Sequence, residues 1–482
     1  MSNEILSGHE EEMPVPFGVR AATGELLPCL KVEALRAIGI DPAAVLRRSQ
    51  NIRVMGADSS VKDPNCLAEA GWGVIFPAGI SPDVVSALEP LLELRKQQAG
   101  DLYREFPNYP IGQSARDWLR KQGVTFALVN PARGVPLYLL LVGSPSQIPF
   151  EFQYLLDSYW NVGRLDFDTA AEFGAYAEAV VEYEKTAVVP TTHSSAVWVP
   201  KNTGDPATGM LHDQVAVPLV YGEHADPPLG LAHGCAISPF LGEQATRENL
   251  EAIFRRRLPH ARPALLFTGS HGMAFDAHDP AEQREGQGAL LSQAWEKGDP
   301  ITPDQYLRGA DLASDIDVRG MMHFLFACYG GGCPANDTYQ RDETGHAIPL
   351  MAAPITARLP QRLLAGGALA VVAHIDRAWS FSFRTDGIPQ VQEMRTVMEL
   401  LLGGARIGQA TDGFNQRWSV LGSELQMLVE EHQQTGAVPA ASLANRWVAR
   451  DDARNYVILG DPAVRLRVEA MQPPTPAAAD SR

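Results

Sequence analysis

Cysteine is scarce in this chain. The sequence of 482 residues contains five, at Cys29, Cys66, Cys235, Cys328 and Cys333, and none belongs to a CxxC pair. A disulfide-stabilised scaffold needs a dense and usually even set of cysteines. The sequence therefore excludes that class of protein and predicts a reducing compartment, which we take to be the cytoplasm.

Long apolar runs and an excess of basic charge are also missing. No uninterrupted apolar stretch approaches the ~18 residues of a membrane-spanning helix, and the polar segment 1–13 lacks the apolar centre of a signal peptide. Lys and Arg number 40 against 57 Asp and Glu, for a net charge of −17. Such an acidic protein is not steered toward nucleic acid or anionic lipid, so we expect neither a nucleic acid nor a membrane as partner.

What the chain does contain is a regular alternation of apolar runs with amphipathic stretches. We predict strands at 51–56, 73–77, 125–129, 137–143, 196–199, 215–221, 264–267, 322–327, 369–375 and 456–459. We predict helices at 82–98, 114–122, 169–185, 246–257, 354–365, 391–402 and 414–432. Several of the strands are continuous Val, Leu and Ile runs, which are typical of a sheet covered by helices on both faces. The expected fold class is therefore α/β, a three-layer sandwich around a mainly parallel sheet.

Composition divides the chain further. Residues 1–50 are mixed and contain prolines, and the Thr- and Ser-rich stretch 186–195 has the character of a linker. We therefore predict an N-terminal extension over 1–50, a smaller α/β subdomain over 51–188 and a larger domain over 189–470. The Pro- and Ala-rich tail 471–482 is expected to be disordered.

Two dipeptides carry the chemistry that the sequence offers. His271-Gly272 and Ala327-Cys328 each follow an apolar, strand-like run. Parallel strands place the loops at their carboxyl ends along one edge of a sheet, where ligand sites of open α/β sheets lie. The pattern predicts that Cys328 is a nucleophile, with His271 accepting its proton and later protonating a leaving amine. The backbone N–H groups of Gly272 and Cys328 would then form an oxyanion hole, worth ~3 kcal/mol per donor.

Other readings of these residues have weaker support. A cysteine after a buried strand is often a small apolar core residue. His271, His278, Cys328 and Cys333 lack the spacing of a zinc site, and the sequence around Ser270 is not the G-x-S-x-G motif of serine hydrolases. We therefore expect no metal and no cofactor.

The chain resembles the caspase-like cysteine peptidases, in particular the gingipain and CHAT-type groups, over residues 135–468. The segments that carry the resemblance are 137–143 with Ile148-Pro149, 162–165 with the stretch ending at Glu184, 270–272, 326–328, 354–379 and the Gly-Asp-Pro segment 456–463. Between the two dipeptides, 288–291 and 301–304 are closer to CHAT domains than to gingipains. We expect Asp461 of Gly-Asp-Pro to be structural, because Asp before Pro is a good turn former.

The resemblance implies a cytosolic cysteine endopeptidase that acts on protein or peptide substrates. It places Glu151 where gingipains carry an acid that orients the histidine. It places Asp157 at the base of a pocket that selects Arg or Lys before the scissile bond, with Trp379 as the aromatic wall of that pocket. Three alternatives stay open: a catalytically silent caspase-like scaffold, a ligand-sensing effector module, and a latent peptidase that an activating partner switches on.

Overall fold

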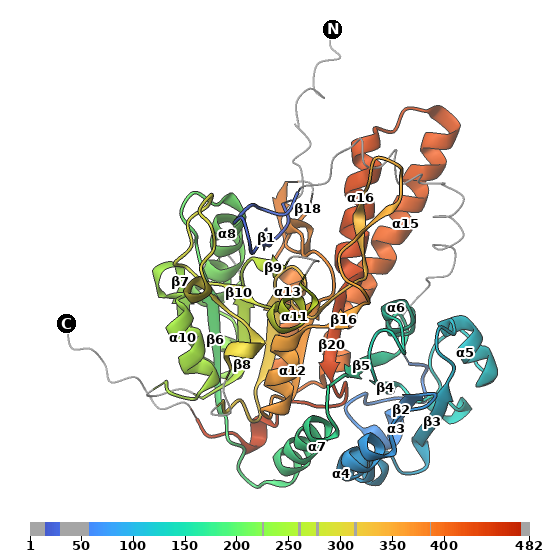
Figure 1. Cartoon of the computed structure of the whole chain (residues 1–482). Helices are drawn as coiled ribbons and strands as arrows, with labels where there is room; N and C mark the ends of the chain where they lie inside the picture. Colours follow the sequence, from blue (N-terminus) through green and yellow to red (C-terminus); the bar gives the residue numbers. More distant parts are fainter. Residues whose placement is uncertain are drawn as a thin grey trace.

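We describe a computed structural model over residues 15–28, 57–223, 226–258, 262–275, 279–312, 316–385 and 387–473. Its centre is a ten-stranded sheet in the order β3-β2-β4-β5-β20-β17-β12-β8-β6-β7 (Figure 1). The strands are β2 (Trp72–Pro77), β3 (Tyr103–Tyr109), β4 (Tyr138–Val142), β5 (Asn161–Leu165), β6 (Thr192–Val199), β7 (Ala236–Leu241), β8 (Pro263–Gly269), β12 (Met322–Phe326), β17 (Ala370–His374) and β20 (Tyr456–Gly460). Most neighbouring strands pair in parallel, whereas β17 and β20 pair with each other in the antiparallel sense.

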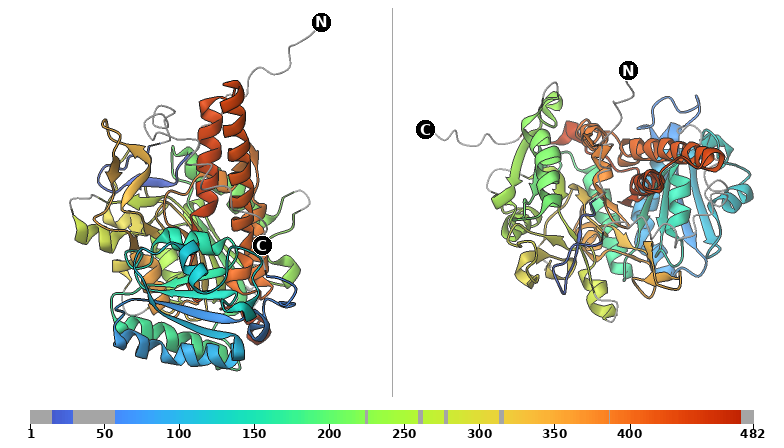
Figure 2. Two further views of the ribbon diagram at one scale, coloured as in Figure 1. Left: turned by 90° about the vertical axis from the view of Figure 1, so that its right-hand side faces the viewer. Right: turned by 90° about the horizontal axis from the view of Figure 1, so that it is seen from above.

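Burial along the strands explains their composition. Every residue of β2, β4, β5, β8, β12, β17 and β20 is buried, while the edge strands β3 and β7 are partly exposed. Helices lie on both faces of the sheet (Figure 2). They include α4 (Pro82–Ala99), α5 (Ala115–Lys121), α6 (Phe150–Asp157), α7 (Ala170–Lys185), α10 (Arg247–Phe254), α12 (Arg358–Ala365) and α13 (Gln392–Leu402). The predicted α/β class with a mainly parallel, doubly covered sheet is confirmed.

Local signals define the starts of the long helices. Ser81 precedes α4 and its hydroxyl accepts the backbone N–H of Asp83, with Pro82 in the first turn. Thr169 and Glu172 form a capping box at the start of α7. These helices begin within a residue of their predicted positions because the caps are encoded locally.

Some predicted elements are wrong. Residues 215–221, predicted as a strand, belong to a π-helical turn (His212–Ala216) and to α9 (Val217–Tyr221). A short apolar run suits a buried helix as well as a buried strand, and Val215, Leu219 and Val220 are buried here in the helical form. Within the predicted strand 125–129, pairing is limited to a bridge between Val129 and Ala57. The predicted strand 51–56 lies outside the described residues.

Other elements were missed by the sequence patterns. They include β3, β5, β7, α6 and α16 (Ala440–Arg454). Helix α16 packs along α15 (Asp412–Thr435), and the two form a long helical hairpin that projects from the rest of the molecule (Figures 1 and 2).

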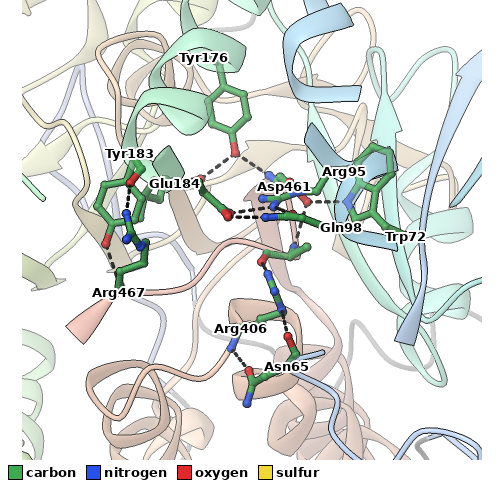
Figure 3. Close-up of polar contacts among 12 residues, drawn as sticks. Asn65, Trp72, Arg95, Gln98, Tyr176, Tyr183, Glu184, Arg406, Asp461 and Arg467 are labelled. Carbon is green, nitrogen blue, oxygen red and sulfur yellow. Dashed lines mark hydrogen bonds and ion pairs between the residues drawn. The ribbon is translucent and has the colours of Figure 1, made fainter. Parts of the chain in front are cut away.

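Strand β20 joins the two groups of strands, because it lies between β5 and β17. Beyond its last residue, Asp461 accepts hydrogen bonds from the Trp72 indole N–H (2.9 Å), the Arg95 Nε–H (2.6 Å) and the Ala463 backbone N–H (3.0 Å) (Figure 3). Arg95 also bonds Glu184 at 2.8 Å. The Gly-Asp-Pro aspartate therefore ties α4, β2 and α7 to the end of β20, in agreement with a structural role.

Replacing Asp461 by asparagine is expected to lower the free energy of unfolding by about 3 kcal/mol, because it removes the charge that faces the fully buried Arg95 guanidinium. Denaturation by urea measures the change. Asp117→Asn is the matched control, since Asp117 pairs with Arg120 at 3.4 Å on the exposed surface and such pairs contribute up to about 1 kcal/mol. Equal losses for the two variants would contradict the structural role of Asp461.

Candidate functional site

Adjacent parallel strands position the candidate residues. β17, β12, β8 and β6 are neighbours in the sheet and run in one direction. The loops at their carboxyl ends therefore lie along one edge. The loop after β6 carries Asp205, the loop after β8 carries His271, Cys328 follows β12, and Ala378 follows β17.

His271 is held by a carboxylate. Its ring is fully buried, and Nε2 donates to Oδ2 of Asp205 at 2.9 Å. A carboxylate accepts only, so the contact places a proton on Nε2, and Nδ1 has no hydrogen-bond partner among the described residues. The indole of Trp295 meets the imidazole edge-on, with ring centroids 5.9 Å apart. The ring is thus fixed with Nδ1 available to exchange a proton.

Asp205 is the N-cap of α8 (Pro206–Leu211), and its Oδ2 also accepts the backbone N–H of Thr208 (2.9 Å) and its hydroxyl (2.7 Å). Burial by itself would raise the pKa of Asp205. Hydrogen bonds from His271 and Thr208 outweigh burial and hold the pKa well below its usual range. The carboxylate therefore stays charged beside the imidazole.

Cys328 is fully buried, and its thiol donates to the Ala378 carbonyl oxygen at 3.6 Å. Burial raises the pKa of this thiol well above its usual value. The next residue, Tyr329, has φ of 57°, and its N–H donates to the Asp376 carbonyl at 2.9 Å. A left-handed conformation is uncommon for tyrosine and is held here by the surrounding contacts.

Two backbone amides converge on one acceptor. The N–H groups of Gly272 (2.8 Å) and Cys328 (3.0 Å) both donate to the carbonyl oxygen of Phe17. A Cβ atom at position 272 would lie 1.8 Å from the Cys328 carbonyl oxygen, so glycine is required there for the two loops to approach. The two loops are thus in direct contact, and the amide pair predicted as an oxyanion hole binds an oxygen in this structure.

The other predicted residues lie in different surroundings. Glu151 is exposed at the start of α6, and the carboxylate in contact with His271 is Asp205 instead. Asp157 is buried at the end of α6 and accepts the Val162 N–H at 3.0 Å. Its burial raises its pKa well above the usual value. The structure brings the loops of His271-Gly272 and Cys328 together at one edge of the sheet, whereas Asp157 is bonded to the start of β5.

The backbone of Trp379 lies beside the site, whereas its indole packs elsewhere. Its indole packs against the Tyr339 ring, with centroids 5.1 Å apart, in a cluster with Leu425, Val429 and Trp447. Its main chain pairs with Pro16.

Sequence reasoning missed Asp205, although a signal was present. The aspartate follows a predicted strand, precedes a proline and has a threonine at 208, which is the pattern of a helix N-cap. A charged residue at the carboxyl end of a strand next to β8 is also where an acid would meet His271. What was missing was the knowledge that β6 is the neighbour of β8.

Within the described ranges, no group of three or more His, Cys, Asp and Glu side chains is placed to hold a metal ion. In the same part of the chain, no helix combines the length and the apolar character needed to cross a bilayer.

Comparison with solved structures finds matches at 11–12% identity with TM-scores below 0.5. The Arg-specific cysteine proteinase gingipain R matches with 11% identity and a TM-score of 0.47, covering 85% of this chain and 81% of its own. The complex of the Porphyromonas gingivalis RgpB pro- and mature domains matches with 12% identity and a TM-score of 0.45, covering 83% and 80%. The Saccharomyces cerevisiae separase–securin complex matches with 12% identity and a TM-score of 0.32, covering 67% of this chain and 15% of that one.

No protein-family model matches the sequence, and no curated protein matches it. At these identities the likeness concerns the fold, and the chemistry of the site has to be argued from this chain's own residues.

Proposed function

We propose that the protein is a cysteine peptidase in which Cys328 is the nucleophile and His271 the proton carrier. One observation carries the proposal: the amides of Gly272 and Cys328 converge on a single carbonyl oxygen. Cys328 also carries the thiol, and Gly272 follows a histidine that is bonded to a carboxylate. A thiol, a fixed imidazole and a pair of oxyanion donors are the parts that acyl transfer requires.

The proposed reaction begins with transfer of the Cys328 proton to Nδ1 of His271, the nitrogen that is not bonded to Asp205. The thiolate attacks the substrate carbonyl carbon, and the two amides stabilise the oxygen as it becomes negative. His271 then gives its proton to the leaving amine as the C–N bond breaks. Water hydrolyses the thioester and returns the thiol. Asp205 acts as a positioning residue, since it holds the ring and favours the charged imidazolium.

Peptidyl acyloxymethyl ketones ending in Phe, Arg or Ala, which alkylate an activated thiol, test the proposal. The segment that contains Phe17 and Gly18 lies against the buried thiol in this structure. The reagents are therefore applied both to the wild-type chain and to Phe17→Glu, and mass spectrometry locates the modified residue. We expect modification of Cys328 by at least one reagent and its loss in Cys328→Ala. The absence of modification of Cys328 by every reagent in both chains would reject the peptidase and favour a silent scaffold.

A further inference from the structure

The segment 15–20 lies against the loop that follows β17. The Phe17 N–H donates to the Ala378 carbonyl at 3.0 Å, and the Ser380 N–H donates to the Val15 carbonyl at 3.2 Å. Pro16 pairs with Trp379 between them in the antiparallel sense. Residues 15–17 thus form a short antiparallel ladder with 378–380, the mode in which an extended peptide adds to an exposed backbone edge.

The register of this segment places one peptide bond at the thiol. The Phe17 carbonyl oxygen occupies the amide pair, and Gly18 follows directly. A Cβ atom at Gly18 would lie 2.9 Å from the Cys328 Cβ and 3.0 Å from its Sγ. The close approach of chain and sulfur at this point therefore depends on the absence of a side chain at Gly18.

Beyond the thiol the segment continues away from the ladder. β1 (Gly18–Arg20) pairs in parallel with β9 (Gly272–Ala274), the strand that follows His271 (Figure 1). The chain thus enters along 378–380, passes Cys328 with a carbonyl in the amide pair, and leaves beside His271. A peptide substrate would need this same path, because its scissile carbonyl must reach both the thiol and the two amides.

The side chain before this bond fills an aromatic pocket. The Phe17 ring is fully buried, and its centroid lies 5.0 Å from that of Phe326, 5.7 Å from that of Phe383 and 6.1 Å from that of His271. Edge-on contacts between aromatic rings are favourable beyond their apolar burial. A guanidinium or ammonium group in the same place would lose its hydration against these rings.

A buried carboxylate that contacts the loop after β17 already has its partners. Asp452 accepts the Trp379 N–H (2.9 Å), the Ser382 hydroxyl (2.7 Å) and the His374 ring (3.1 Å). Its oxygens are therefore occupied by donors of the protein itself. The carboxyl group of Asp157, expected to select a basic side chain, is bonded at the start of β5.

We propose that residues 15–20 occupy the cleft as a substrate would, that the pocket selects an aromatic side chain before the scissile bond, and that this segment competes with other peptides until it is displaced. The peptide-cleaving part rests on the proposed function, whereas the binding preference does not. The expected substrates are thus peptides with Phe or Tyr before the bond, in contrast to the basic residue that the sequence resemblance implies.

Contacts on the far side of the thiol hold the segment in place. The Leu27 N–H donates to the Gly18 carbonyl and the Arg20 N–H to the Glu25 carbonyl, both at 2.8 Å, which folds 18–27 into a hairpin. Val19 and Leu27 are buried. An intramolecular competitor of this kind acts at a high effective concentration, so a free peptide competes poorly with it.

Hydrolysis of two coumarin amides, Val-Pro-Phe and Val-Pro-Arg, tests the preference and the competition together. Phe17→Glu places a charge in the aromatic pocket and is expected to raise turnover of Val-Pro-Phe at least about tenfold over the wild-type chain, while Phe17→Tyr is expected to stay within about threefold of it. Val-Pro-Phe is expected to exceed Val-Pro-Arg in kcat/KM at least about tenfold. Preference for Arg, or equal turnover by the Phe17→Glu and wild-type chains, would overturn the inference.

A binding experiment separates this inference from the proposed function. Fluorescein-labelled Val-Pro-Phe-Gly and Val-Pro-Arg-Gly are titrated by anisotropy into Phe17→Glu carrying Cys328→Ala, with Phe17→Ala replacing Phe17→Glu if circular dichroism shows that the charged variant is unfolded. Tighter binding of the Phe peptide without hydrolysis by any chain would uphold the pocket and reject the peptidase. Hydrolysis with equal or tighter binding of the Arg peptide would uphold the peptidase and reject the pocket.

Discussion

Replacing Cys328 by alanine is expected to lower kcat/KM for peptide hydrolysis by at least about 10⁴-fold, because the step that forms the acyl-enzyme then has no nucleophile. The measurement uses Val-Pro-Phe coumarin amide and the Phe17→Glu chain as background, so that the cover over the site does not limit the rate. Removal of a nucleophile leaves the oxyanion donors and the binding cleft in place, and the residual rate reports their contribution.

Cys333→Ala is the matched control. Cys333 is also a buried free cysteine, five positions along the chain, and its thiol donates to the Pro334 carbonyl at 3.4 Å. Burial likewise raises the pKa of the Cys333 thiol well above its usual value. We expect Cys333→Ala to retain kcat/KM within about threefold of its background. A comparable loss in the two variants would mean that the effect comes from packing, and the role of Cys328 as nucleophile would not stand.

Replacing Asp205 by asparagine is expected to lower kcat by about 10²- to 10⁴-fold while KM changes by less than about threefold. Asparagine caps helices as well as aspartate does, so α8 keeps its start. The substitution removes the negative charge. It also allows an NH2 group, in place of an oxygen acceptor, to face Nε2 of His271. A neutral amide stabilises the imidazolium less and allows the ring to carry its proton on the wrong nitrogen, which affects the proton transfers and leaves substrate binding unchanged.

A second pair of aspartate and histidine provides the matched control for this substitution. Asp213 accepts from His212 Nδ1 at 2.7 Å and from Lys201, and its side chain is 55% exposed. Asp213→Asn is therefore expected to leave both kcat and KM unchanged. A rise in KM with kcat preserved in Asp205→Asn would assign Asp205 to the shape of the cleft, because a residue that positions the histidine should act on kcat.

The thiol of Cys328 is buried by a separate segment of the chain, so its burial does not by itself identify Cys328 as a core residue. Cys328 and His271 are both fully buried, which in an ordinary core would identify a cysteine as a small apolar residue. The group that lies over Cys328 is the segment around Phe17 and Gly18, and it uses the two amides and the backbone of 378–380. Burial by a separate segment of the chain, joined through backbone hydrogen bonds, is compatible with a cleft that opens when this segment leaves.

The sequence predicted well where the determining interactions are local. Helix caps such as Ser81 and Thr169 lie next to the helices that they start, and the continuous apolar runs of β4, β12 and β17 report burial on both faces. The prediction of a strand at 215–221 was wrong because the length and composition of this apolar run suit either a strand or a helix. The charged, partly exposed strand β3 was missed because the sequence of an edge strand has a weak apolar pattern.

For the candidate site, the division follows the distance along the chain between interacting residues. His271-Gly272 and Ala327-Cys328 are determined by the sequence itself, since each dipeptide follows an apolar strand and parallel strands present such loops at one edge. Only the tertiary structure could decide that Asp205 meets His271 and that Phe17 fills the pocket beside Cys328. Both contacts join segments distant in sequence. Their partners are set by the order of strands in the sheet and by the path of residues 15–20 across it, and neither leaves a periodic pattern in the amino acids.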